Sequence, residues 1–182
     1  MTKGTPLIYP LSALRALVLH TQLLSTPQGA APLPTPQAML AVVKALGYLQ
    51  MDTLQVVNRA HYITLWARLG GYPLDDLHRL VYSAGQRQLY EGWGHAASLI
   101  PLEHYRYHRW RSDPNISHNP GFRAWLSQSG HQEQVEQTLA RIRATERGLR
   151  VGDFEDPDGP RGAWYDWRPS KTALEVLFAR AI

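Results

Sequence analysis

The 182-residue sequence contains no cysteine, little lysine and no long run of apolar residues. Without cysteine the chain can form neither disulfides nor thiolate zinc sites, as is typical of proteins from a reducing compartment. No apolar stretch reaches the roughly 20 residues that a membrane-spanning helix needs. Residues 1–6 carry one charge, Lys3, and precede no long apolar segment, so a signal peptide is not expected. These absences favour a cytoplasmic protein.

The remaining composition is that of an ordinary globular protein. Hydrophobic residues make up 44% and charged residues 19% of the chain, which is long enough for one large domain or two small ones. The formal net charge is +4, and lysine occurs only at Lys3, Lys44 and Lys171, so nearly all cations are arginines. Arginine forks suit phosphates and base edges, which indicates a nucleic-acid partner. A GC-rich genome would explain the same arginine bias without any function.

Apolar residues recur at helical spacing along most of the chain, and extended segments are few and short. Caps, prolines and apolar stripes predict helices over residues 12–24, 36–46, 54–69, 73–82, 101–110, 122–128, 131–147 and 169–178. Residues 48–53 are predicted to form a short strand, and residues 88–93 an extended segment. The pattern predicts a mainly α fold with short β strands, built from tandem winged-helix or helix-turn-helix domains. We place the first domain at residues 1–129 and the second, which ends before its wing, at residues 130–182.

The most informative segment is Leu49-Gln50-Met51-Asp52-Thr53, in which apolar and polar residues alternate. In an extended segment Gln50 and Asp52 point to the same side, while Leu49 and Met51 pack behind them. An amide can orient a water molecule while a neighbouring carboxylate accepts its proton, so the pair suits hydrolysis. The alternative is structural, since such residues also occur on solvated strand edges and an aspartate before threonine often caps a helix.

A second candidate segment is residues 104–111, where cations and aromatic rings alternate. Phosphates attract the arginines, and unstacked bases stack on the rings. Arg106, Arg109 and Arg111 are therefore candidate DNA contacts, although the aromatic residues of this segment also suit a helix core. His104 and His108 have the spacing of zinc ligands on a helix, but Tyr105 stands where a metalloprotease has glutamate and no third ligand is evident. We predict no metal site.

Two further segments combine aromatic and polar residues. Trp93 and His95 stand beside small residues, which allow close backbone approach, so both are candidate pocket residues. A hydrogen-bonded structural role for His95 is the alternative. Near the C-terminus, Trp164 and Trp167 suit packing, while Arg168 and Lys171 at the start of a predicted helix suit phosphate contacts.

Several blocks together resemble the N-terminal half of the YcaQ/AlkZ-like winged-helix DNA glycosylases. The blocks are Leu49-Gln50-Met51-Asp52-Thr53, Arg59-Ala60-His61, Thr64-Leu65-Trp66-Ala67-Arg68-Leu69, Glu91-Gly92-Trp93-Gly94-His95-Ala96-Ala97, and Trp164-Tyr165-Asp166-Trp167-Arg168-Pro169-Ser170-Lys171 followed by Leu174-Glu175-Val176-Leu177-Phe178. Each block alone is common, but their order and spacing make the match specific from about residue 11 to residue 178. The Gln-apolar-Asp motif matches the YcaQ-like branch of the family.

The resemblance implies a bacterial DNA repair enzyme that removes N7-alkylated guanines and unhooks interstrand crosslinks. Gln50 and Asp52 are then catalytic, and the expected DNA contacts are Arg59, His61, Arg106, Arg109, Arg111, Arg168 and Lys171. No lysine lies near the motif, so we expect a monofunctional glycosylase that leaves an abasic site. It needs no metal or organic cofactor, acts on double-stranded DNA as a monomer, and is expected in the cytoplasm at the nucleoid.

The chain is about half as long as the family members that it resembles. The sequence therefore leaves two alternatives to an active glycosylase. One is a winged-helix DNA-binding protein without catalysis, such as a regulator; the other is an inactive truncated remnant with an exposed apolar patch.

Overall fold

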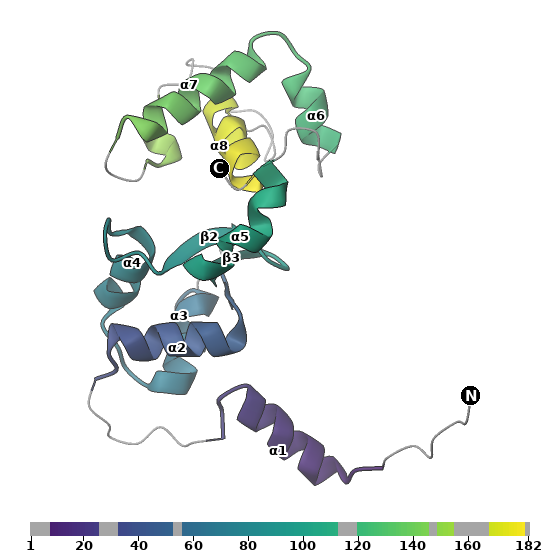
Figure 1. Cartoon of the computed structure of the whole chain (residues 1–182), viewed down its shortest axis with the longest axis vertical. Coiled ribbons are helices and arrows are strands. Elements are labelled where there is room, and N and C mark those ends of the chain that lie inside the picture. The colour runs from purple at the N-terminus through teal and green to yellow at the C-terminus, as the bar shows by residue number, and fades with distance from the viewer. Residues whose placement is uncertain are drawn as a thin grey trace. The chain divides into compact units, whose positions relative to one another are not determined.

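The computed structural model describes residues 8–25, 33–52, 56–112, 120–145, 149–154 and 168–180, with only the backbone for Arg111 and Ser112. The chain divides into two compact units, Met1–Leu102 (unit 1) and Glu103–Ile182 (unit 2). Short helices dominate both, and one small sheet lies in unit 1 (Figure 1). The predicted fold class, mainly α with short β strands, is thereby confirmed. The two units were not predicted. The boundary predicted between residues 129 and 130 separates two winged-helix domains, and it stays a prediction.

Unit 1 has the element order of a winged-helix domain. Its elements are α2 (Pro36–Leu46), β1 (Leu49–Gln50), α3 (Ala60–Leu69), α4 (Leu74–Tyr82), β2 (Leu89–Trp93) and β3 (Ala97–Pro101). The strands form an antiparallel sheet in the order β1-β3-β2. Helices α3 and α4, joined by a short turn, form the helix-turn-helix, and the β2–β3 hairpin is the wing.

Local sequence signals explain the ends of α2. The side-chain oxygen of Thr35 accepts a hydrogen bond from Ala38 N at 3.2 Å, and Pro36 occupies the first helical position. Gly47 ends the helix with φ of 87°, a conformation that glycine adopts without strain. These two signals were predicted from the sequence, and the structure confirms them.

Two predicted elements differ from the structure. The helix expected from residue 54 begins at Ala60, because Asn58 accepts a hydrogen bond from Arg59 N at 2.8 Å and so favours a turn. Residues 53–55 lie outside the described residues. Residues 97–101 form β3, which was not predicted, and Pro101 ends this strand instead of opening a long helix. Their apolar side chains show no alternation, because most of this central strand is buried on both faces.

A hydrophobic core joins α2, α3 and α4 of unit 1 to its sheet. Leu49 of β1, Leu65 of α3 and Leu99 of β3 are almost fully buried in it. Its other buried members are Met39, Val42, Val43, Leu77, Leu80, Val81 and Leu89. Because Leu49 is anchored here, the residues that follow it on β1 are held at a fixed position on the sheet.

Helix α1 (Leu11–Thr21) precedes this core and contributes nothing to it, since every described residue from 8 to 25 is exposed. It ends in a Schellman motif, in which Leu24 N donates to Leu19 O at 2.8 Å and Leu23 N to His20 O at 3.0 Å. Leu23 has φ of 56°, the left-handed conformation that this motif usually assigns to glycine.

Replacing Leu23 with glycine is expected to stabilise the end of α1 by about 0.5 to 1 kcal/mol, because glycine adopts the left-handed conformation without a Cβ clash. The measurement is helicity by circular dichroism during thermal unfolding. Leu24→Gly is the matched control, since that residue needs no positive φ and its replacement is expected to destabilise. Equal effects of the two substitutions would contradict the argument.

Unit 2 is helical throughout its described residues. It contains α5 (Tyr105–His108), α6 (Pro120–Leu126), α7 (His131–Arg143) and α8 (Pro169–Ala179), with short 3-10 segments at Leu102–His104, Arg109–Ser112 and Val151–Asp153. Its core consists of Val135, Ala173, Val176 and Leu177, with Phe122 and Trp125 packed against it. The long helix predicted from residue 101 is thus replaced by a chain of short turns. Nowhere in the described ranges is a helix both long and apolar enough to cross a membrane.

Candidate active site

The predicted catalytic pair lies where β1 leaves the sheet. Gln50 is exposed and lies opposite Ser98 of β3, while Asp52 is half-buried just beyond the strand. Met51 N donates a hydrogen bond to Ala97 O at 2.8 Å, so the strand-like path continues past Gln50. Alternate residues of a strand point to the same side, so a path that stayed extended as far as Asp52 would present Gln50 and Asp52 on one face of the sheet. The catalytic role of the pair stays a prediction.

The wing brings the predicted pocket residues to the same end of the sheet. Trp93 pairs with Ala97, and Ala97 accepts the hydrogen bond from Met51, so these three residues lie in line across the strands. One strand separates Met51 from Trp93, a distance of roughly 10 Å. His95 is exposed in the turn that follows Trp93, and Trp93 is 40% exposed. The sequence could not have shown this proximity, because it depends on β3.

Gly92 lies across β3 from Gln50, since both residues are in register with Ser98. A Cβ atom at this glycine would stand 2.8 Å from Cε2 of Tyr90 and 3.2 Å from Cδ1 of Ile100. Ser98 itself is fully buried, and its hydroxyl donates to Ala96 O at 2.9 Å. The hairpin therefore fits tightly against its own side chains beside Gln50.

Replacing Gly92 with alanine is expected to destabilise the chain by roughly 1 kcal/mol, because the Tyr90 ring must move away from the new methyl group. Urea unfolding measures the change. Gly71→Ala is the matched control, since a Cβ atom there meets nothing within 4 Å. Equal free energies of unfolding for Gly92→Ala and Gly71→Ala would show that the hairpin packs more loosely than the structure indicates.

The N-terminus of α3 carries two residues predicted to contact DNA, and their environments differ. Arg59 is exposed at the N-cap position, while His61 is 5% exposed. The His61 ring lies 4.0 Å from the Tyr62 ring, and His61 Nδ1 has no hydrogen-bond partner among the described residues. Burial, together with the charge of Arg59 and with His78, lowers the pKa of His61 to about 4. The DNA contact of His61 stays a prediction, and it would require this neutral ring to become exposed.

Sequence reasoning missed a polar network that ties the helix-turn-helix together. The hydroxyl of Tyr62 and His78 Nε2 are 2.8 Å apart, which links α3 to α4. The hydroxyl of Tyr82 donates to Glu91 Oε1 and so links α4 to the wing. Their separations in sequence carry no recognisable spacing, so only the tertiary structure reveals the pairs.

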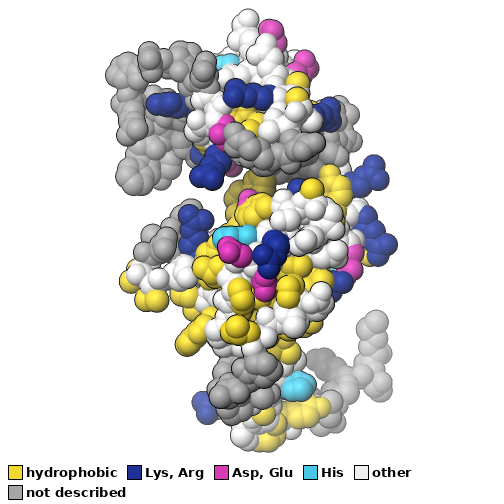
Figure 2. All heavy atoms as spheres, turned by 90° about the vertical axis from the view of Figure 1, so that its left-hand side faces the viewer, with side chains coloured by type: hydrophobic (Ala, Val, Ile, Leu, Met, Phe, Trp, Pro, Cys, Tyr) yellow, Lys and Arg dark blue, Asp and Glu magenta, His cyan; other side chains and the backbone are white. Residues whose placement is uncertain are grey.

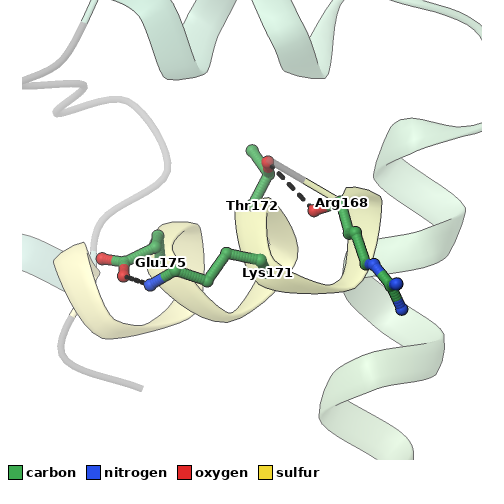
Figure 3. Close-up of polar contacts among 4 residues, drawn as sticks. All are labelled: Arg168, Lys171, Thr172 and Glu175. Carbon is green, nitrogen blue, oxygen red and sulfur yellow. Dashed lines mark hydrogen bonds and ion pairs between the residues drawn. The ribbon is translucent and has the colours of Figure 1, made fainter. Parts of the chain in front are cut away.

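Two of the predicted DNA contacts of unit 2, Arg168 and Lys171, lie at the start of α8. In Figure 3, Lys171 of α8 is directed toward Glu175, with which it forms an ion pair, while the Arg168 side chain points away from both. Thr172 donates to Arg168 O at 3.4 Å and so satisfies a carbonyl at the start of the helix. Arg168 is exposed, so its guanidinium is the better placed of the two for a phosphate. Residues 155–167, with Trp164 and Trp167, lie outside the described residues.

The other predicted contacts lie in the segment after the wing. Arg106 on α5 is exposed, and its guanidinium carbon lies 4.7 Å from the centre of the Tyr107 ring. Arg109 is exposed on the following turn, and the side chain of Arg111 is not described. The described part of the chain contains no cluster of three or more acidic or histidine side chains that could bind a metal ion.

Unit 1 belongs to the class of winged-helix-like domains, whose main use is DNA binding. Residues 43–181 match the family model described as DNA glycosylase AlkZ-like. The chain therefore belongs to the AlkZ-like DNA glycosylase family, as the resemblance predicted, and its partner is DNA. No solved structure matches the chain significantly.

Proposed function

We propose that this chain is a monofunctional DNA glycosylase that hydrolyses the N-glycosidic bond of N7-alkylguanine and unhooks interstrand crosslinks. The observation that supports this most is that exposed Gln50 ends β1 and half-buried Asp52 follows it two residues later, beside the hydrogen bond from Met51 N to Ala97 O. Family membership supports the reaction class, and the Gln-apolar-Asp motif favours the YcaQ-like branch.

The chemistry needs little beyond the pair. Alkylation at N7 makes guanine cationic, so it leaves readily and no strong general acid is required. The sugar then passes through an oxocarbenium-like state, which a carboxylate stabilises. In this proposal Asp52 stabilises that cation and accepts a proton from the attacking water, while the Gln50 amide orients the water. Water is the nucleophile, so no covalent enzyme intermediate forms and an abasic site remains.

DNA binding is proposed to use exposed arginines on both units. Arg59 lies at the N-terminus of α3, and Arg106, Arg109 and Arg168 are exposed on unit 2. Contacts of arginine with phosphate fix the register of a protein on duplex DNA without reading its sequence. Helix α4, the second helix of the helix-turn-helix, is poorly suited to phosphate contacts at its N-terminus, because its first turn carries Asp75 and Asp76. We propose a monomer that acts on double-stranded DNA at the nucleoid.

The test is release of N7-methylguanine from a duplex, with alkaline cleavage without heating to reveal abasic sites. The proposal expects cleavage by the parent chain and none above background by Asp52→Asn. Fluorescence anisotropy with the same duplex separates binding from chemistry. A parent chain that binds but releases no base would overturn the glycosylase proposal.

One observation favours a second candidate, a winged-helix protein that binds DNA without catalysis. The helix-turn-helix and the wing are both present in unit 1, and neither requires the catalytic pair. Binding without base release, unchanged by Gln50→Ala and Asp52→Asn, is the result expected for this candidate. A chain that neither binds nor releases base fits the inactive remnant.

A further inference from the structure

The helix-turn-helix of unit 1 carries an apolar groove on its outer side. The groove has a volume of about 530 Å³ and is lined by Val57, Asn58, Tyr62, Ile63, Trp66, Gly71, Tyr72 and Leu74, the set that we name the Trp66 groove. Val57 is 86% and Trp66 60% exposed. Figure 2 shows hydrophobic side chains over the middle of the surface, around a small group of acidic, basic and histidine side chains. An open apolar surface of this kind usually marks an interaction site.

One hydrogen bond braces the wall of this mostly apolar groove. The hydroxyl of Tyr72 donates to Tyr62 O at 3.1 Å, which fixes the turn against α3. Burial raises the pKa of Tyr72, so this hydroxyl keeps its proton. The rigid wall and the exposed Trp66 and Ile63 side chains suit an apolar helix face.

Helix α1 has a matching surface without a partner. Leu11, Leu14 and Val18 recur at helical spacing and form an apolar stripe that Leu17 widens. None of these residues is buried, and none lines the Trp66 groove. An isolated helix of 11 residues is marginal in water and is normally stabilised by packing its apolar face.

One side chain already links α1 to the helix that lines the groove. Arg68, in the last turn of α3, donates from Nε to Gln22 O at 2.8 Å and from Nη1 to Thr64 O at 2.9 Å. The C-terminal end of a helix carries partial negative charge, so a guanidinium binds its last carbonyls favourably. This contact holds the C-terminal end of α1 beside the C-terminal end of α3.

We propose that α1 of the same chain docks its Leu14/Val18 stripe into the Trp66 groove, running parallel to α3 with Arg68 as its anchor. Both helices rise about 1.5 Å per residue, so Val18, four residues before Gln22, comes level with Thr64, four residues before Arg68 and adjacent to Ile63. Attachment to one chain keeps α1 at a high effective concentration, which favours this occupant over a second copy. The docked helix covers Trp66 and completes the core of unit 1.

The absence of cysteine from the sequence gives a direct test by disulfide crosslinking. Val18→Cys with Ile63→Cys is expected to form a disulfide within one chain at least ten times faster than Ala16→Cys with Ile63→Cys. Ala16 is the matched control, because it lies about 160° around the helix from Val18. Equal rates would overturn the proposal. A disulfide of the Val18 pair that only joins two chains would also overturn it and would point to a second copy.

Hydrogen exchange on the full chain provides a second measurement that needs no cysteine. The α1 amides of the parent are expected to exchange at least ten times more slowly than those of Ile63→Lys, because the charge blocks docking. Equal exchange in both chains would overturn the proposal. So would protection that develops only when DNA is added, since DNA and not the groove would then order α1.

Discussion

Asp52→Asn is expected to lower the rate of N7-methylguanine release about 10³-fold while leaving DNA affinity within about twofold, on the scale usual for a positioned general base. Asparagine keeps the size and the hydrogen-bonding reach of the side chain but cannot accept the proton of water. It also cannot offset the positive charge that develops on the sugar. The effect should therefore appear in the chemical step and not in binding. Single-turnover base release and anisotropy on the same duplex measure the two quantities.

The control for Asp52→Asn is Asp75→Asn, which makes the same change of charge at an exposed position on α4. This variant is expected to release base at the parent rate. Gln50→Ala is expected to release base about 10- to 100-fold more slowly than the parent. Water can still reach the Asp52 carboxylate in this variant, but no amide orients it. Equal losses in Asp52→Asn and Asp75→Asn would show that net charge, and not the pair, governs the rate.

The second large effect is a loss of stability on mild acidification, caused by His61. Its pKa is about 4 in the folded chain, against the ordinary histidine pKa of 6.5 that holds in the unfolded chain. Between these values the unfolded state binds more protons, so the free energy of unfolding rises with pH through this window. We expect a loss of about 2 kcal/mol between pH 7 and pH 5, and about 3 kcal/mol in total below pH 4. Urea unfolding across this range measures it.

His61→Leu is expected to remove this pH dependence. Leucine fills a similar volume without a ring nitrogen that needs a hydrogen bond, so the variant should be at least as stable at pH 7 and should lose little at pH 5. His20→Gln, which removes an exposed histidine on α1, should leave the parent profile unchanged. A profile equally steep in His61→Leu and the parent would assign the acid sensitivity to other groups.

The elements that the sequence predicted best are those defined by neighbouring residues. Thr35, Pro36 and Gly47 set the ends of α2 through backbone geometry alone, so no tertiary contact was needed to place them. The short strand expected at the start of residues 48–53 is equally local, and the structure forms it at Leu49–Gln50 with one further strand-like hydrogen bond at Met51. Helix α8 was also predicted from Pro169 onward, because a proline at the first turn of an apolar-periodic segment is a strong start signal.

The features that were missed depend on contacts between distant residues. Strand β3 pairs with both β1 and β2, and only that pairing places Trp93 and His95 at the end of the sheet where Asp52 lies. The Tyr62–His78 hydrogen bond spans 16 residues. Lys171 was predicted as a phosphate contact, and the structure adds its ion pair with Glu175.

Composition, local periodicity and the order of short motifs were enough to predict the fold class, the family and the residues of the candidate pair. The surroundings of those residues came from the tertiary structure. It buried His61, kept Arg168 exposed, aligned the wing with β1 and formed the Trp66 groove from residues of α3 and its neighbouring turns. The physical reason is that burial and proximity depend on the packing of distant segments, whereas caps and alternation depend on a few adjacent dihedral angles.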